Sequence, residues 1–155
     1  MTSYYVWLLP CRQHSDQLRR VMLDLNRAYG GPIFLPHVTL ASMDKPINLE
    51  KSHPVVRLPV IDVVAGHSAT QCIMMRLRET TSFNQLQSQF GEQSAPHMSL
   101  LYDHANRLPM HRRNDLSSHV HLPIPSIEFD RIGLVRGGPV VSEWEIIQSL
   151  PLNEA

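Results

Sequence analysis

Two short segments of the chain share a pattern of residue types that can carry acid–base chemistry. The segment PHVTL at residues 36–40 has a counterpart, PHMSL, at residues 96–100. Both read proline, histidine, apolar residue, hydroxyl residue, leucine. A single His-x-Thr arises by chance in many chains, whereas two matched copies that divide the chain into similar parts indicate an internal duplication.

The alternation of side chains along a strand predicts which of these residues act together. Residues i and i+2 of a strand point to the same face. The histidine and the hydroxyl residue of each segment, His37 with Thr39 and His97 with Ser99, therefore project together, and the apolar residues between them point to the core. A pseudo-twofold relation between two halves of the chain would place both pairs around one cleft.

Two imidazoles and two hydroxyls in one cleft suit the cleavage of a phosphodiester. With an ordinary pKa of about 6.5, one neutral imidazole can take a proton from water while a protonated one gives a proton to the leaving oxygen. The hydroxyls can donate hydrogen bonds to the phosphate oxygens. We therefore predict His37 and His97 as catalytic residues and Thr39 and Ser99 as phosphate-binding residues, with no metal required.

The pattern of apolar residues predicts the elements that must position these side chains. A helix precedes each histidine-bearing strand, a pair of strands follows it, and no linker or low-complexity segment interrupts the chain. We predict strands at 4–9, 36–42, 55–66, 69–78, 97–102, 124–135 and 140–150, helices from an N-cap at Ser15 to Gly30, from residues 80–82 to Gly91 and from Pro109 to about 118, and tight turns at 66–68 and 137–139.

Composition limits the class of protein. The 155 residues are expected to form a single α+β domain, residues 1–155, of two pseudo-symmetric lobes. Lys plus Arg equals Asp plus Glu, 14 each, which argues against a protein that coats nucleic acid or membrane surfaces. The sequence has no signal-peptide pattern and no apolar run near the roughly 18 residues of a membrane span. We expect a cytoplasmic monomer with Cys11 and Cys72 as free thiols, although one disulfide is an alternative.

At these segments the sequence resembles the 2H phosphoesterase superfamily, which is named for two His-x-(Thr/Ser) motifs in a duplicated two-lobe fold. It is most similar to the cyclic phosphodiesterase group of plants and yeast, through YVWLLP at 5–10, PHMSLLY at 96–102 and the last strand with Trp144. The resemblance covers essentially the whole chain. It implies antiparallel sheets that line a central cleft, with the helices outside.

The resemblance also implies an activity and roles for individual residues. It implies cofactor-free hydrolysis of nucleoside 2′,3′-cyclic phosphates or of ADP-ribose 1″,2″-cyclic phosphate, with His97 as base and His37 as acid. Tyr102 and Trp7 are candidates to contact the sugar or base, and core packing is the alternative for both. This chain has Ala-Thr at 69–70 where the plant enzymes carry aromatic residues, so the preferred substrate is expected to differ.

Two further functions remain open from the sequence. The same fold could act on RNA, as a 2′,3′-cyclic phosphodiesterase or ligase at RNA 3′ ends or on 2′-5′ oligonucleotides, or it could bind a phosphate ligand without catalysis. A zinc site is not predicted from the remaining histidines, because their spacing is irregular and no cysteine lies near them. Those histidines are His104, His111, His119 and His121.

Overall fold

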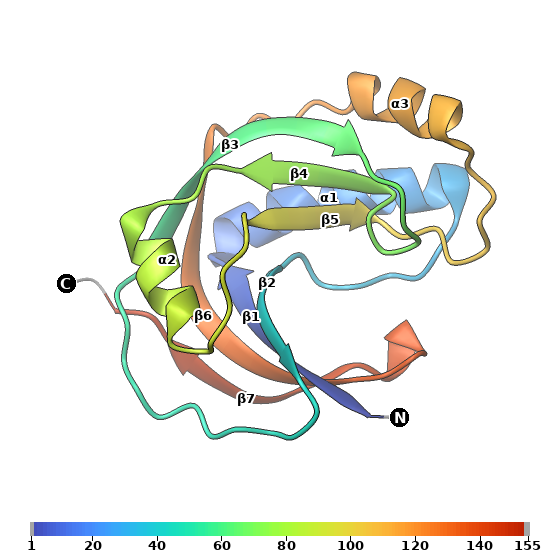
Figure 1. The fold of residues 1–155 in the computed structure, drawn as a ribbon. Helices are drawn as coiled ribbons and strands as arrows, with labels where there is room; N and C mark the ends of the chain where they lie inside the picture. The colour runs from blue at the N-terminus through green and yellow to red at the C-terminus, as the bar shows by residue number, and fades with distance from the viewer. Residues whose placement is uncertain (1, 154–155) are drawn as a thin grey trace.

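The strands of the chain form one strongly curved, seven-stranded antiparallel sheet (Figure 1). The computed structural model describes residues 2–153. The strand order is β2-β1-β6-β3-β4-β5, and β7 pairs with β6. The strands are β1 (Ser3–Pro10), β2 (Val38–Met43), β3 (Val56–Ala65), β4 (Ile73–Leu77), β5 (His97–Leu101), β6 (Ser126–Gly137) and β7 (Glu145–Pro151).

Strand β3 belongs to both halves of the sheet. Its first residues, 56–59, pair with β6, and its later residues, 60–65, pair with β4. The curvature of the sheet brings its two ends, β2 and β5, into contact with each other (Figure 1). These two end strands are the ones that carry the repeated His-x-Thr/Ser segments.

Within residues 2–153, three α-helices cover the sheet: α1 (Arg12–Tyr29), α2 (Thr81–Ser88) and α3 (Met110–His119). Helix α1 packs against β1 and β5 through Leu18, Met22 and Leu25, and α3 packs against β3 and β4. Thr80 caps α2 by accepting a hydrogen bond from the backbone N–H of Phe83. The predicted α+β class with antiparallel strands is confirmed, and no described helix is long and apolar enough to span a membrane.

Helix α1 begins at Arg12 rather than after an N-cap at Ser15, so this part of the prediction is wrong. Hydrogen bonds to a residue distant in sequence, Glu128, determine where α1 begins. The backbone N–H of Cys11 donates to the carbonyl of Glu128 on β6, and the N–H of Glu128 donates to Nδ1 of His14. These bonds hold the first turn against the sheet and leave Ser15 inside the helix.

Two connections also differ from the prediction. Strand β4 begins at Ile73 rather than at residue 69, so residues 66–72 form a loop instead of a tight hairpin turn. The connection from β6 to β7 continues past residue 139 into a short 3₁₀ helix, Val141–Glu143. The indole N–H of Trp144 donates to the carbonyl of Gly138 and closes this connection. Both connections border the cleft described next.

Candidate active site

A cleft of about 330 Å³ lies beside β1 and β2. Its walls come from β1, β2, the 66–72 loop, the end of β5 and the β6–β7 connection. Among the residues that the structure describes, its lining includes no lysine, arginine or carboxylate. The lining consists of Tyr5, Trp7, His37, Thr39, Thr70, Tyr102, His104, Gly138, Pro139 and Trp144.

The first motif lies in this cleft as its alternation predicts. His37 and Thr39 line the cleft, while Val38 and Leu40 are buried in the core on the other side. In the second motif, on β5, Met98 and Leu100 are buried in the same core. The pattern of alternating faces is therefore present in both segments.

His37 is held in one orientation and one protonation state. Its Nδ1 donates to the carbonyl of Leu35 at 2.7 Å, which leaves Nε2 as the acceptor of the neutral ring. The imidazole stacks on Trp7, with ring centroids 3.6 Å apart and planes 11° from parallel. Burial, with a smaller contribution from the positive charge of a protonated His97, lowers the pKa of His37 to about 4, against the opposing effect of the Leu35 hydrogen bond. The side chain is neutral at pH 7.

His97 is held by a similar contact. It hydrogen-bonds the carbonyl of Ala95, two residues earlier, just as His37 bonds that of Leu35. In both segments a proline separates the carbonyl from the histidine. Nε2 of His97 lies 3.3 Å from Nε2 of Gln71. Burial lowers the pKa of His97, and the bond to Ala95 opposes that change.

The two hydroxyl residues have different surroundings. Thr39 is exposed to the cleft. Ser99 is buried, and its Oγ donates to the carbonyl of Thr70 at 2.6 Å. Neither His97 nor Ser99 lines the cleft; they bond instead to Gln71 and Thr70 of the 66–72 loop. The two motifs still lie near each other, because β2 and β5 are in contact.

Trp7 and Tyr102 both line the cleft, yet each is almost completely buried. One face of Trp7 is covered by His37. Tyr102 stacks on Phe34 at 3.8 Å, with His104 parallel to it at 5.7 Å. Burial, and then the neighbouring Tyr5, raises the pKa of the Tyr102 phenol far above its ordinary value, so the phenol stays protonated. Only the edges of these rings remain for a ligand.

Several residues that line the cleft or contact His97 were not predicted as site residues. Tyr5 was detectable, because it is two positions before Trp7 on one strand and so shares its face. Trp144 was noted only for the resemblance of its strand. Thr70 and Gln71 lie in a loop where no periodic pattern marks them. His104 follows the end of β5, and its stacking on Tyr102 has no signal in the sequence.

The other histidines and the cysteines lie apart from this arrangement. Within residues 2–153, no group of three or more His, Cys, Asp and Glu side chains comes together in a way that could hold a metal ion. Nδ1 of His119 is 2.7 Å from the carbonyl of Asp115 in its own helix. Cys11 and Cys72 are free cysteines.

Comparison with known proteins identifies the fold. No family model matches the chain, and no curated protein matches it. Among solved structures, E. coli LigT complexed with ATP is 16% identical, with 99% of this chain and 98% of that chain covered and a TM-score of 0.59. A structure described as a phosphoesterase is 15% identical over 99% of this chain and all of that chain, with a TM-score of 0.60.

A third protein, TT0787 of Thermus thermophilus, is 12% identical over 99% of both chains, with a TM-score of 0.57. LigT has also been determined with 3′-AMP and with NADP⁺. At these identities the likeness concerns the fold. The chain therefore has a LigT-like fold along its whole length, as the resemblance in sequence implies.

Proposed function

We propose that this protein is a metal-independent cyclic phosphodiesterase of the 2H phosphoesterase superfamily. The observation that carries the proposal is a pair of histidines, one directly before β2 and one at the start of β5, each bonded to the carbonyl two residues before it, on strands that contact each other. The proposed substrates are small cyclic phosphates, namely nucleoside 2′,3′-cyclic phosphates or ADP-ribose 1″,2″-cyclic phosphate. The LigT-like fold, seen elsewhere with nucleotides bound, supports this class of ligand.

In the proposed reaction, water attacks phosphorus while one ring P–O bond of the cyclic ester breaks. One histidine takes the proton that the water loses, and the other gives its proton to the leaving oxygen. Thr39 donates to a phosphate oxygen, and Ser99 can do so once its hydroxyl turns from the Thr70 carbonyl. The products are a phosphate monoester and a free hydroxyl.

Burial favours His37 as base and His97 as acid, which is the reverse of the order that the resemblance implies. The pKa of His37 is lowered to about 4 by burial, so its ring resists protonation. His97 is less buried and carries a smaller penalty for charge. An anionic phosphate raises the pKa of both rings, and the more accessible ring takes the proton first. His97 is therefore proposed to hold the proton that the leaving oxygen receives.

The aromatic residues receive supporting roles in this proposal. Trp7 holds the plane of His37 through stacking, and Tyr102 offers a protonated hydroxyl at its edge. Neither has a free ring face on which a base could stack. Sugar and base contacts are assigned to the outer wall of the cleft, where Trp144 and the 138–139 segment lie.

Activity of the purified protein with EDTA present tests the proposal. His37→Ala and His97→Ala should each lower kcat/KM for a 2′,3′-cyclic nucleotide by about 10²–10⁴-fold. His119→Ala, which changes an exposed histidine on α3, is the matched control and should retain the wild-type rate. Full activity in both His37→Ala and His97→Ala would sink the proposal. Binding seen by calorimetry without product would instead assign the protein as a phosphate-binding module.

Action at RNA 3′ ends is the second candidate, and the fold shared with LigT favours it. The uncharged lining of the cleft and the zero net charge weigh against a long RNA path. A cyclic mononucleotide and an oligonucleotide with the same cyclic end separate the two candidates. An RNA enzyme should prefer the oligonucleotide and lose affinity steeply as salt rises, whereas the first proposal predicts similar affinities.

A further inference from the structure

The loop between β3 and β4, residues 66–72, touches the site at three points. Thr70 lines the cleft, and its carbonyl accepts the hydrogen bond of Ser99 at 2.6 Å. The side-chain amide of Gln71 lies 3.3 Å from Nε2 of His97. The position of this loop therefore decides what surrounds the second motif.

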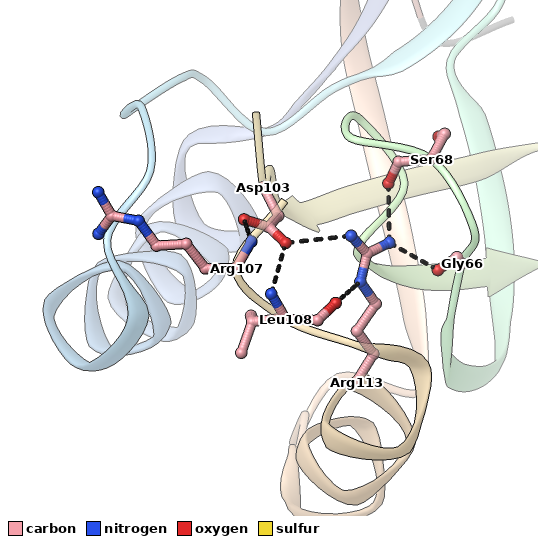
Figure 2. A network of polar contacts seen from close by, with 6 residues as sticks. All are labelled: Gly66, Ser68, Asp103, Arg107, Leu108 and Arg113. Atoms are coloured by element: carbon pink, nitrogen blue, oxygen red, sulfur yellow. Dashed lines mark hydrogen bonds and ion pairs between the residues drawn. The ribbon is translucent and has the colours of Figure 1, made fainter. Parts of the chain in front are cut away.

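A buried ion pair outside the cleft holds this loop (Figure 2). Nη1 of Arg113, on α3, donates to the carbonyls of Gly66 at 2.9 Å and Ser68 at 3.0 Å. Nη2 of Arg113 donates to the carboxylate of Asp103 at 3.1 Å. The backbone N–H of Asp103 donates to the carbonyl of Ala69 at 2.7 Å. The loop is thus bonded at three residues before Thr70, namely Gly66, Ser68 and Ala69.

Both side chains of the Asp103–Arg113 pair are buried and have further hydrogen-bond partners. Arg113 is 4% exposed and Asp103 is 7% exposed. Nε of Arg113 donates to the carbonyl of Leu108, and the carboxylate of Asp103 also accepts the backbone N–H groups of Arg107 and Leu108. Burial alone would raise the pKa of Asp103, but these bonds and Arg113 outweigh burial and hold that pKa below its usual value.

Stability alone is a weak reason for such a pair. Burying two charges costs several kcal/mol per ion before their attraction offsets it, and apolar residues of similar size often stabilise a fold as well. What an apolar residue cannot supply is a rigid fork of donors aimed at loop carbonyls. By contrast, the pair Arg57–Glu128 lies at the surface of the sheet.

Gly66 connects Arg113 to Gln71, because its carbonyl accepts from Arg113 and its Cα packs against the backbone of Gln71. A Cβ added at Gly66 would lie 1.8 Å from the backbone oxygen of Gln71, so the two backbones are in direct contact. The N–H of Gly66 also donates to the carbonyl of Cys72 at 3.0 Å. Fixing Gly66 therefore fixes the backbone of Gln71, whose side chain reaches His97.

We propose that the Asp103–Arg113 pair positions the active site, acting through the 66–72 loop to hold Gln71 against His97. The Gln71 amide can donate its N–H to the neutral ring or, turned over, accept from the protonated ring. Gln71 can therefore keep His97 in place through the proton transfer. This inference rests on the proposed function for its kinetic part only.

Arg113→Met tests the pair, since it keeps the length of the side chain and removes its donors. We expect kcat to fall by about 10–100-fold, as misplacement of a reacting group does, while KM changes by less than about threefold. In an NMR titration, the pKa of His97 should rise toward its ordinary value while that of His37 stays low. Arg57→Met, which removes the surface pair with Glu128, is the control and should match the wild type in both measurements.

Gln71→Ala and the double variant locate the effect in the loop. Gln71→Ala alone should shift the His97 titration in the same direction, and adding Arg113→Met should lower kcat little further, because both act on one contact. A lower melting temperature for Arg113→Met with unchanged kcat and an unchanged His97 titration would overturn the proposal. The proposal would also be overturned if the fall in kcat of the double variant equalled the product of the falls in the two single variants.

Gly66→Ala keeps the test decisive if Arg113→Met does not fold. The added methyl pushes the Gln71 backbone away while the ion pair stays, so the same loss of kcat and the same His97 shift are expected. Wild-type values in both Gly66→Ala and Gln71→Ala would refute the inference. The titration needs no turnover, so it still decides the positioning role if His37→Ala shows that the proposed reaction is wrong.

Discussion

At the scale of single residues, the two histidines have similar backbone partners and different burial. Each bonds the carbonyl two residues before it, across a proline. One face of His37 is additionally covered by Trp7, whereas His97 is more exposed and contacts the side-chain amide of Gln71. Two residues that look equivalent in the sequence therefore have different affinities for a proton, and division of labour follows from that difference.

The pH dependence of kcat/KM should reflect this difference. The proposed base, His37, must be neutral, so activity should rise with pH through about 4; the proposed acid, His97, must be protonated, so activity should fall as pH passes its pKa, which burial lowers below 6.5. We expect a bell-shaped profile with an acidic optimum. The residual activity of His97→Ala should lack the alkaline limb, and that of His37→Ala the acid limb. Exchanged limbs would instead give the roles that the family resemblance implies.

At the scale of elements, the sequence pattern predicted those features of helices and strands that depend on neighbouring residues. The alternating faces of β2 and β5 were predictable from the i, i+2 rule, and Gly30 at the end of α1, with φ of 78°, from C-cap chemistry. The 66–72 loop was not predictable, because Arg113 holds it from 47 residues further along the chain. The start of α1 was predicted wrongly for the same reason, because Glu128 on β6, which bonds His14 in the first turn, is 114 residues away in the sequence.

The segment that leads from α1 to His37 depends on a glycine. Gly31 has φ of +97°, and a Cβ there would lie 2.5 Å from the backbone oxygen of Tyr102. Gly31→Ala should lower the free energy of unfolding by about 1–3 kcal/mol through backbone strain. The clash with the Tyr102 carbonyl should add to this loss. Gly91→Ala, at φ of +75° with no atom within 4 Å, carries strain alone. Urea unfolding of both variants measures the difference, and equal losses would exclude an effect of the Tyr102 contact.

At the scale of the molecule, the fold brings together segments that are distant in sequence. The sheet order places the two motif strands at opposite ends, and curvature joins them. The origin of the fold in a duplication of two lobes stays a prediction, which the matching carbonyl bonds of the histidines support. Of the predicted site residues, Trp7, His37, Thr39 and Tyr102 line the cleft, whereas Thr70 and Pro139 line it from connections between strands, where no periodic pattern marks site residues.

Burial of a neutral histidine should make the whole fold sensitive to acid. Between pH 6.5 and about 4 the unfolded chain binds a proton that folded His37 does not, so stability falls as pH falls through this window. The shift corresponds to a loss of about 3 kcal/mol at the acid end. Urea unfolding at several pH values should show this loss, and His37→Gln should remove most of it. An unchanged pH dependence in His37→Gln would contradict the burial argument.

The position of β2 and β5 has a consequence for self-association. The end strands of an open sheet present backbone donors and acceptors that can recruit another chain, which is a common route to aggregation. In this protein the two end strands turn toward each other, since the sheet curves until they touch. The curvature that brings the two motif strands together therefore also limits the access of another chain to the edges of β2 and β5, although this protection does not extend to β7, which pairs with β6 off this path.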